Sequence, residues 1–142
     1  MTSVMIVDDD FMIADWLEEV LTDAGYEVCG VAGTVGDAIA LGERLRPELG
    51  VIDMRLPDGG NGTDVATALR RHGRFGVLYA TGNAEHPLLN DAVGEGCIAK
   101  PFSASSLIIA LGIVSDVAAH RPITCALPHE FRLLTRSLPR VA

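Results

Sequence analysis

Short apolar runs alternate with segments of helical periodicity along most of this chain, and this alternation limits the folds that it can adopt. No apolar run approaches the length needed to span a membrane. The pattern is typical of an α/β domain in which helices connect parallel strands and cover both faces of one sheet. The expected strands are Val4–Val7, Glu27–Val31, Leu49–Ile52, Gly76–Ala80 and Cys97–Ala99.

Five helices are expected between and after these strands, which gives a doubly wound, five-stranded parallel sheet. The first helix has apolar residues on one face, including Leu17 and Leu21, and Gly25 follows as a stop signal. The last one extends to Ala118. Each helix has a capping or early-turn residue near its start: Asp10, Thr34, Thr63, Pro87 and Ser103.

Length and charge narrow the class of protein. The chain has 142 residues, which is the size of one ordinary domain. Residues 1–119 carry 18 acidic side chains against 7 basic ones, and an acidic body argues against direct binding of nucleic acid. The three cysteines lack zinc-site spacing, and no secretory leader is recognisable. A cytoplasmic protein without a membrane segment is expected.

The end of the chain differs from the rest, so the domain is predicted over residues 3–118 and a basic tail or linker over 119–142. Residues 120–142 carry one acid, Glu130, and four arginines. Three prolines exclude one continuous helix. A short amphipathic helix with Phe131, Leu134 and Leu138 on one side is expected near the end of the tail.

Polar residues follow four of the five predicted strands. They are Asp8 and Asp9 after the first strand, Asp53 after the third, Thr81 after the fourth and Lys100 after the fifth. In a parallel sheet these ends share one edge, where ligands bind at the point of strand-order reversal. Taken singly, each residue also fits a cap, a turn or a solvated loop. Taken together, they predict one polar site.

The chemistry of this set is narrow. Several close carboxylates favour a hard cation such as Mg²⁺, which takes oxygen ligands and retains water. A hydroxyl and an ammonium suit the oxygens of a phosphoryl group, and an aspartate can itself act as the nucleophile. Lys100 is the only lysine in the chain. Asp10 directly precedes the first helix and is assigned to its N-cap.

Four motifs in this order and spacing, IVDDD, VIDMRLPDG, YATG and IAKPF, resemble the receiver domain of two-component response regulators, the CheY-like family. The resemblance covers about residues 3–118 and implies strand order 2-1-3-4-5. It also implies that the phosphoryl donor is a sensor histidine kinase or a histidine phosphotransfer protein. The implied roles are phospho-acceptor for Asp53, Mg²⁺ ligands for Asp8, Asp9 and the Arg55 carbonyl, switch hydroxyl for Thr81 and charge partner for Lys100.

Two departures from the family pattern affect the expected switch. YATG is similar to the Phe-Ala-Thr-Gly signature of a largely alphaproteobacterial, often stand-alone subgroup, but Tyr79 replaces the phenylalanine. Cys97 stands where most receivers carry Tyr or Phe, so it is assigned to the core and the signal is expected to pass through the fourth helix. Arg55 and Asn83 occupy positions at which members of the family that this chain resembles tune the lifetime of the acyl phosphate, and Arg55 is expected to reach over the site and slow attack by water.

Three functional hypotheses remain at this stage. The first is a single-domain receiver that acts by protein contacts, with Ile108, Ile109 and Ile113 either as a docking or homodimer surface or as additional core. The second is a receiver belonging to a larger hybrid kinase or transcription factor. The third is a Mg²⁺-dependent phosphohydrolase, although such enzymes usually place an acid where this chain has Arg55. The tail arginines are expected to fold back on the acidic body or to bind the kinase.

Overall fold

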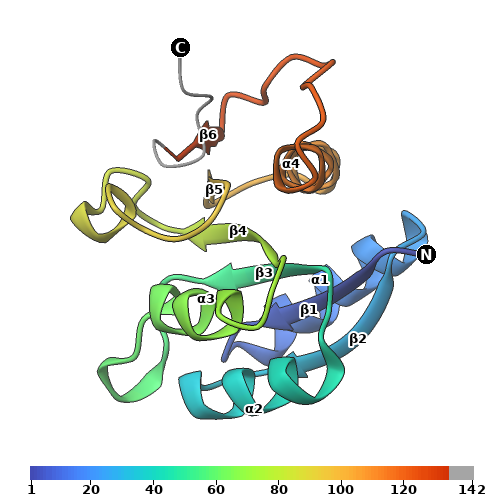
Figure 1. The fold of residues 1–142 in the computed structure, drawn as a ribbon. Coiled ribbons are helices and arrows are strands. Elements are labelled where there is room, and N and C mark those ends of the chain that lie inside the picture. Colours follow the sequence, from blue (N-terminus) through green and yellow to red (C-terminus); the bar gives the residue numbers. More distant parts are fainter. Residues whose placement is uncertain (135–142) are drawn as a thin grey trace.

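A computed structural model describes residues 1–134, in which six strands form one sheet. The strands are β1 (Ser3–Val7), β2 (Glu27–Ala32), β3 (Leu49–Asp53), β4 (Gly76–Thr81), β5 (Gly96–Ala99) and β6 (Phe131–Leu133). Their order is β2-β1-β3-β4-β5-β6, and the first five pair in parallel (Figure 1). The predicted α/β fold and its 2-1-3-4-5 order are confirmed, and the antiparallel β6 adds one edge strand.

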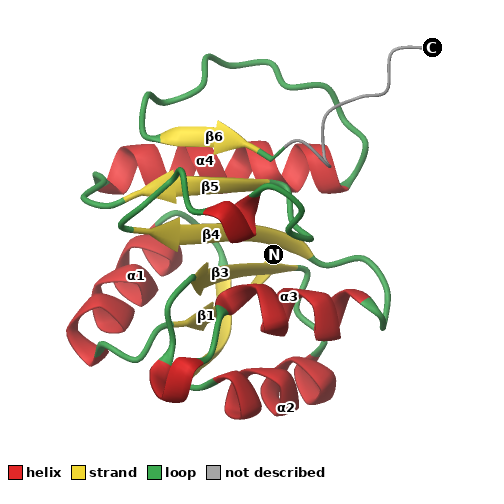
Figure 2. Ribbon diagram, turned by 90° about the vertical axis from the view of Figure 1, so that its left-hand side faces the viewer, coloured by secondary structure: helices red, strands yellow, loops and turns green. Residues whose placement is uncertain are grey.

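Four α-helices cover the two faces of the sheet in the described part of the chain. They are α1 (Phe11–Asp23), α2 (Val35–Leu45), α3 (Gly62–Arg70) and α4 (Ala104–Ala118). Helices α2 and α3 lie in front of the sheet in Figure 2 and α4 lies behind it, so two apolar cores form. The side chains of Asp10, Thr34 and Ser103 accept backbone N–H groups at the helix starts, as predicted.

The predicted fourth helix is wrong. Between β4 and β5 the described chain forms only one short 3-10 turn, η2 (Pro87–Leu89). Side chains satisfy backbone donors locally: Asn83 Oδ1 accepts from the Glu85 amide at 3.0 Å, and His86 Nδ1 accepts from the Leu88 amide at 3.1 Å. Such bonds compete with helix formation.

The predicted amphipathic helix in the tail is also wrong for its described residues. Phe131 belongs to β6, and the two apolar side chains enter opposite cores rather than one helical face: Phe131 joins the α1–α4 side and Leu134 joins the α2–α3 side. The edge of β5 offers unpaired backbone groups, and β6 satisfies them. Leu138 lies outside the described residues.

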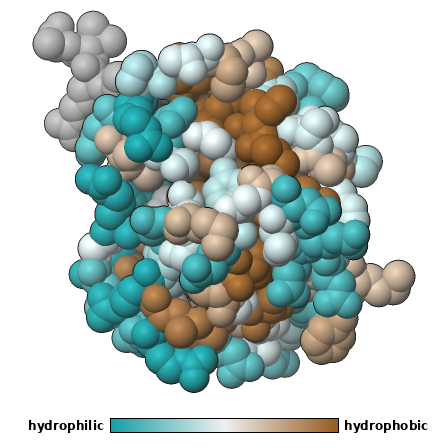
Figure 3. Space-filling model, turned by 90° about the vertical axis from the view of Figure 1, so that its right-hand side faces the viewer, coloured by the Kyte–Doolittle hydropathy of each residue, from teal (hydrophilic) through white to brown (hydrophobic). Residues whose placement is uncertain are grey.

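Packing on α4 decides between the two readings of its isoleucines. Ile113 is buried, at 1% exposure, and belongs to the core, so a docking surface that includes it is wrong. Ile109 remains exposed. Figure 3 shows apolar side chains on the face that α1 and α4 cover. Phe11 and Met12, at the start of α1, are also exposed. In the described part of the chain, no helix has the length and apolar character needed to cross a membrane.

Candidate functional site

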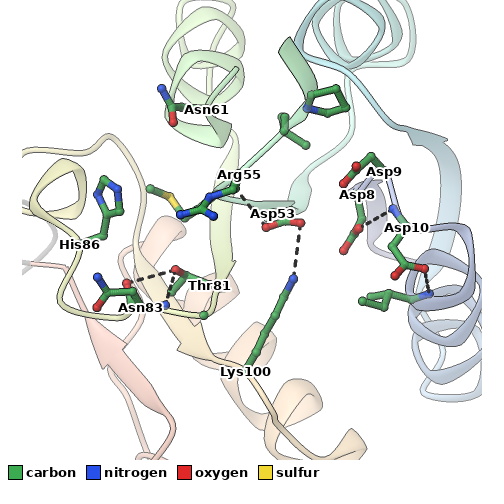
Figure 4. A pocket seen from close by; sticks show the side chains of 15 residues that line it. Asp8, Asp9, Asp10, Asp53, Arg55, Asn61, Thr81, Asn83, His86 and Lys100 are labelled. Atoms are coloured by element: carbon green, nitrogen blue, oxygen red, sulfur yellow. Dashed lines mark hydrogen bonds and ion pairs between the residues drawn. The ribbon is translucent and has the colours of Figure 1, made fainter. Parts of the chain in front are cut away.

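The carboxyl ends of four strands meet at one edge of the sheet, and the structure brings together the five side chains that the sequence singled out. These side chains, Asp8, Asp9, Asp53, Thr81 and Lys100, line one pocket (Figure 4). Strand order reverses at β1, since β2 lies on one side of it and β3 on the other. The pocket therefore lies at the topological switch point, the usual ligand site of an open α/β sheet.

Three carboxylates form a close acidic cluster at this edge. Oxygens of Asp8, Asp9 and Asp53 lie within 4.8 Å of one another. Asp8 is buried and Asp9 is exposed. Burial raises the pKa of Asp8, and the charges of Asp53 and Asp9 act in the same direction, whereas the Asp10 amide and the Lys100 charge oppose them. Negative charge therefore exceeds positive charge in the cluster, and its carboxylate oxygens are the ligands that hard divalent cations prefer.

The Asp53 carboxylate is oriented by contacts to both of its oxygens. Oδ2 lies 3.4 Å from the Lys100 ammonium, and Oδ1 accepts from the Arg55 amide at 3.3 Å. The side chain is only 13% exposed. These contacts hold both oxygens of a carboxylate, a group that can act as a nucleophile.

The Thr81 hydroxyl is engaged in a tight local turn with Asn83. It donates to the Asn83 carbonyl at 3.1 Å and accepts from the Asn83 amide at 3.0 Å. Since a hydroxyl has one proton to donate, Thr81 can bind an anionic group in the pocket only by redirecting that proton away from Asn83. Engagement of Thr81 by a ligand therefore changes the restraint on the following loop.

Other polar side chains line the outer part of the pocket. The Arg55 side chain extends from the end of β3 toward the β4 loop, and Asn83 lies beside Thr81 (Figure 4). His86 and Asn61 also line the pocket and were missed by sequence reasoning. His86 was placed just before a predicted helix, so only recognition that residues 82–95 form a loop would have revealed its position.

Cys97 is a buried core residue, as predicted. It is fully shielded from solvent and lies in the core on the α2–α3 face of the sheet. Burial raises the pKa of its thiol, while the nearby Arg132 guanidinium acts in the opposite direction. A thiol of raised pKa is a poor nucleophile, so this residue contributes packing rather than redox chemistry.

Comparisons with known proteins agree with this architecture. The sequence profile of the response regulator receiver domain matches residues 4–112. A solved CheY-like receiver domain from Methanospirillum hungatei is 28% identical, covers 84% of this chain and 98% of its own, and superimposes with a TM-score of 0.72.

Two curated relatives are longer than this chain. The transcriptional regulatory protein PdtaR of Mycobacterium tuberculosis is 33% identical over 138 residues, which cover 95% of this chain and 65% of PdtaR. The phyllosphere-induced regulator PhyR of Methylorubrum extorquens is 31% identical over 124 residues, which cover 84% of this chain and 46% of PhyR. The chain thus spans about two thirds or less of these relatives, and it belongs to the response regulator receiver domain family.

Proposed function

We propose that this receiver is a phosphorylation switch in which Asp53 accepts the phosphoryl group. The observation that carries the proposal is the pairing of the Asp53 carboxylate with the Lys100 ammonium at 3.4 Å, beside two further acids. Of the clustered carboxylates, Asp53 is the one held between an ammonium and a backbone amide. Such a carboxylate is suited to nucleophilic attack on phosphorus.

The proposed transfer forms one bond to phosphorus and breaks another. An Asp53 oxygen forms a bond to phosphorus as the bond from phosphorus to the donor's imidazole nitrogen breaks, and that nitrogen keeps the electron pair. Negative charge spreads over the phosphoryl oxygens, where Lys100 and the Thr81 hydroxyl can stabilise it. In dephosphorylation, water attacks phosphorus in the same geometry, and the products are free phosphate and the Asp53 carboxylate.

The residues present fit a magnesium ion. Asp8, Asp9, Asp53 and the backbone carbonyl of Arg55 would hold it, and the crowded carboxylates are its natural oxygen donors. When bound, the ion neutralises the cluster and offsets charge on the phosphoryl oxygens. The protein holds the three carboxylates close together at the ends of the neighbouring strands β1 and β3.

The substitution Asp8→Asn is expected to weaken metal binding without preventing folding. In wild type, Mg²⁺ at ten times its Kd should add about 1.4 kcal/mol to the free energy of unfolding, because the ion binds only the folded cluster. The variant should lose most of this gain. Without metal at pH 7 it should be more stable than wild type, because burial raises the pKa of Asp8 above its ordinary value of 3.8 and makes its charge costly.

Urea titrations with and without Mg²⁺ would measure both effects. The metal-free advantage should shrink as the pH falls toward 3.8, because the folded protein protonates Asp8 before the unfolded chain does. Asp23→Asn, at the exposed end of α1, provides a control with the same change in charge. An undiminished gain from Mg²⁺ in Asp8→Asn would contradict the assignment.

Arg55 is proposed to shield the acyl phosphate from water. Its side chain extends over the outer part of the pocket, between Asp53 and the β4 loop (Figure 4). Arg55→Ala is expected to shorten the half-life of phosphorylated Asp53 about fivefold, which corresponds to about 1 kcal/mol in the barrier. Arg71→Ala, exposed after α3, should match wild type in the same dephosphorylation time course. A wild-type half-life in Arg55→Ala would exclude shielding.

A phosphohydrolase is the less well supported function for this pocket. The position two residues after Asp53 carries Arg55, which cannot act as a general acid at neutral pH. Sustained release of phosphate from a small ester would favour the hydrolase, whereas one acyl phosphate per chain would favour the switch. The chemistry that we propose for this pocket is limited to self-phosphorylation and self-dephosphorylation.

Partners and location follow from the same proposal. The phosphoryl donor is a sensor histidine kinase or a histidine phosphotransfer protein, and the output is a protein contact rather than direct binding of nucleic acid. The acidic charge of residues 1–119 supports this choice. A cytoplasmic location, homodimerisation on phosphorylation and membership of the subgroup with the Phe-Ala-Thr-Gly signature are proposed with it. Within a longer protein, the same chain would act as the input domain.

Incubation with acetyl phosphate and Mg²⁺, followed by intact-mass measurement, tests the proposed function. One phosphoryl group per chain is expected, and chelation of Mg²⁺ before the donor is added should prevent its addition. A chain that gains no mass with donor and metal present would exclude a receiver that is phosphorylated in this way.

A further inference from the structure

One arginine of the tail reaches the loop that borders the pocket. Arg132 in β6 donates from Nη2 to the Ala84 carbonyl at 2.6 Å, across 48 positions of sequence. Ala84 directly follows Asn83, the residue that forms the turn with the Thr81 hydroxyl. The Thr81–Asn83 hydrogen bonds, the Asn83–Ala84 peptide bond and the Arg132–Ala84 hydrogen bond therefore connect the pocket with β6.

The side chain of Arg132 is set by the strand register. Arg132 lies opposite Cys97 in the antiparallel β5–β6 pair, so both side chains point to the same face of the sheet. On this face the small Cys97 side chain leaves room for the guanidinium. Phe131 enters the opposite core and fixes the strand, which leaves Arg132 directed at the β4 loop.

The hydrogen bonds of this arginine are incomplete. Its Nε is buried and has no hydrogen-bond partner within residues 1–134. The Nη2–Ala84 bond and a side-chain hydrogen bond to Cys97 together compensate for burying part of the guanidinium. A movement of the Ala84 carbonyl would remove the first of these bonds and disfavour the docked position of β6.

We propose that Arg132 is a positioning residue for the Thr81 loop, and that its contact with Ala84 couples phosphorylation of Asp53 to the docking of β6. The inference rests on the proposed function of Asp53. When Thr81 turns its proton to a phosphoryl oxygen, the Asn83 carbonyl loses that donor and the Asn83–Ala84 segment shifts. Arg132 then loses its Ala84 acceptor, and β6 loosens from β5.

Two backbone amides report the docking of β6. The Leu134 amide donates to the Glu95 carbonyl at 3.1 Å, and the Ala99 amide donates to the Glu130 carbonyl at 2.9 Å. Both bonds join β5 and the β6 segment, so their hydrogen exchange follows the opening of this edge. The Gly76 amide, which donates to the Glu48 carbonyl at 2.9 Å at the end of β4 away from the pocket, provides an internal reference.

Hydrogen exchange should be measured with and without acetyl phosphate and Mg²⁺, with phosphate incorporation followed by mass in each sample. Exchange at Leu134 and Ala99 should become about tenfold faster in phosphorylated wild type, a factor within the usual range of coupling between sites. In Arg132→Ala it should already be fast and should not respond to phosphorylation. Thr81→Ala should take up phosphate without the tenfold change.

Arg121→Ala is the matched control, because Arg121 belongs to the same tail but pairs with Asp116 at 3.0 Å. It should retain the full response. If Arg132→Ala fails to fold, Arg132→Lys and the wild-type and Thr81→Ala samples still decide the question. Phosphorylated wild type with unchanged exchange at Leu134, or an Arg132→Ala protein with the full response, would overturn the coupling alone. A wild type that never gains phosphate would overturn the proposed function and the coupling with it.

Discussion

Asp53→Asn is expected to abolish phosphate incorporation from acetyl phosphate. The amide has the size of the carboxylate but lacks the charge that pairs with Lys100 at 3.4 Å and the nucleophilic oxygen. The mass gain should fall from one phosphoryl group per chain to none. Folding should be preserved, because the Arg55 amide can still donate to the remaining oxygen.

The control for this experiment is Asp23→Asn, which removes an equal charge at the exposed end of α1 and should leave incorporation at the wild-type level. Circular dichroism and urea unfolding would establish that Asp53→Asn is folded. Persistence of one phosphoryl group in that variant would transfer the acceptor role to another residue, with Asp9, the exposed acid of the cluster, as the next candidate.

Phe131→Ala is expected to lower the free energy of unfolding by about 3 kcal/mol, the usual cost of deleting a buried phenylalanine side chain. Phe131 is 6% exposed and packs in the α1–α4 core, although it belongs to the basic tail. Gly96 lies beneath the Phe131 ring, where any Cβ would collide with it. The close approach of β6 to β5 therefore depends on this glycine.

Leu127→Ala is the matched control for the tail, because Leu127 is 45% exposed and its truncation should change stability by less than about 0.5 kcal/mol. Urea unfolding of both variants beside wild type is the measurement. Equal stability of Phe131→Ala and wild type would mean that β6 is not docked in solution and that residues 119–134 act as a linker.

A receiver domain over residues 3–118 and a basic tail or linker over 119–142 were predicted from the sequence, and this division stays a prediction. The family profile ends at residue 112, whereas the sheet continues through β6 at residues 131–133. Arg121 pairs with Asp116, only five residues earlier at the end of α4, so the predicted folding of tail arginines onto the acidic body stays a prediction. Arg132 instead binds a backbone carbonyl, and the remaining two arginines lie outside the described residues.

The sequence predicted those parts of the site that depend on local pattern. Apolar runs located the ends of β1, β3, β4 and β5, and the polar residue after each run then had to lie at the shared edge. Capping residues such as Asp10 were equally readable, since a cap bonds to amides two or three residues away. The position of His86 in the pocket was not predicted, because it depends on a loop for which the periodicity of the sequence had predicted a helix.

Sequence alone determined the five parallel strands, their order once the family resemblance was recognised, and the gathering of Asp8, Asp9, Asp53, Thr81 and Lys100. These features follow from residue patterns within short windows and from the geometry common to parallel sheets. Tertiary structure alone decided that β6 completes the sheet, that Ile113 is buried, and that Arg132 reaches Ala84. Each of these depends on contacts between residues far apart in the chain, either at an open edge of the sheet or in the core. The residue pattern of a short segment does not reveal such contacts.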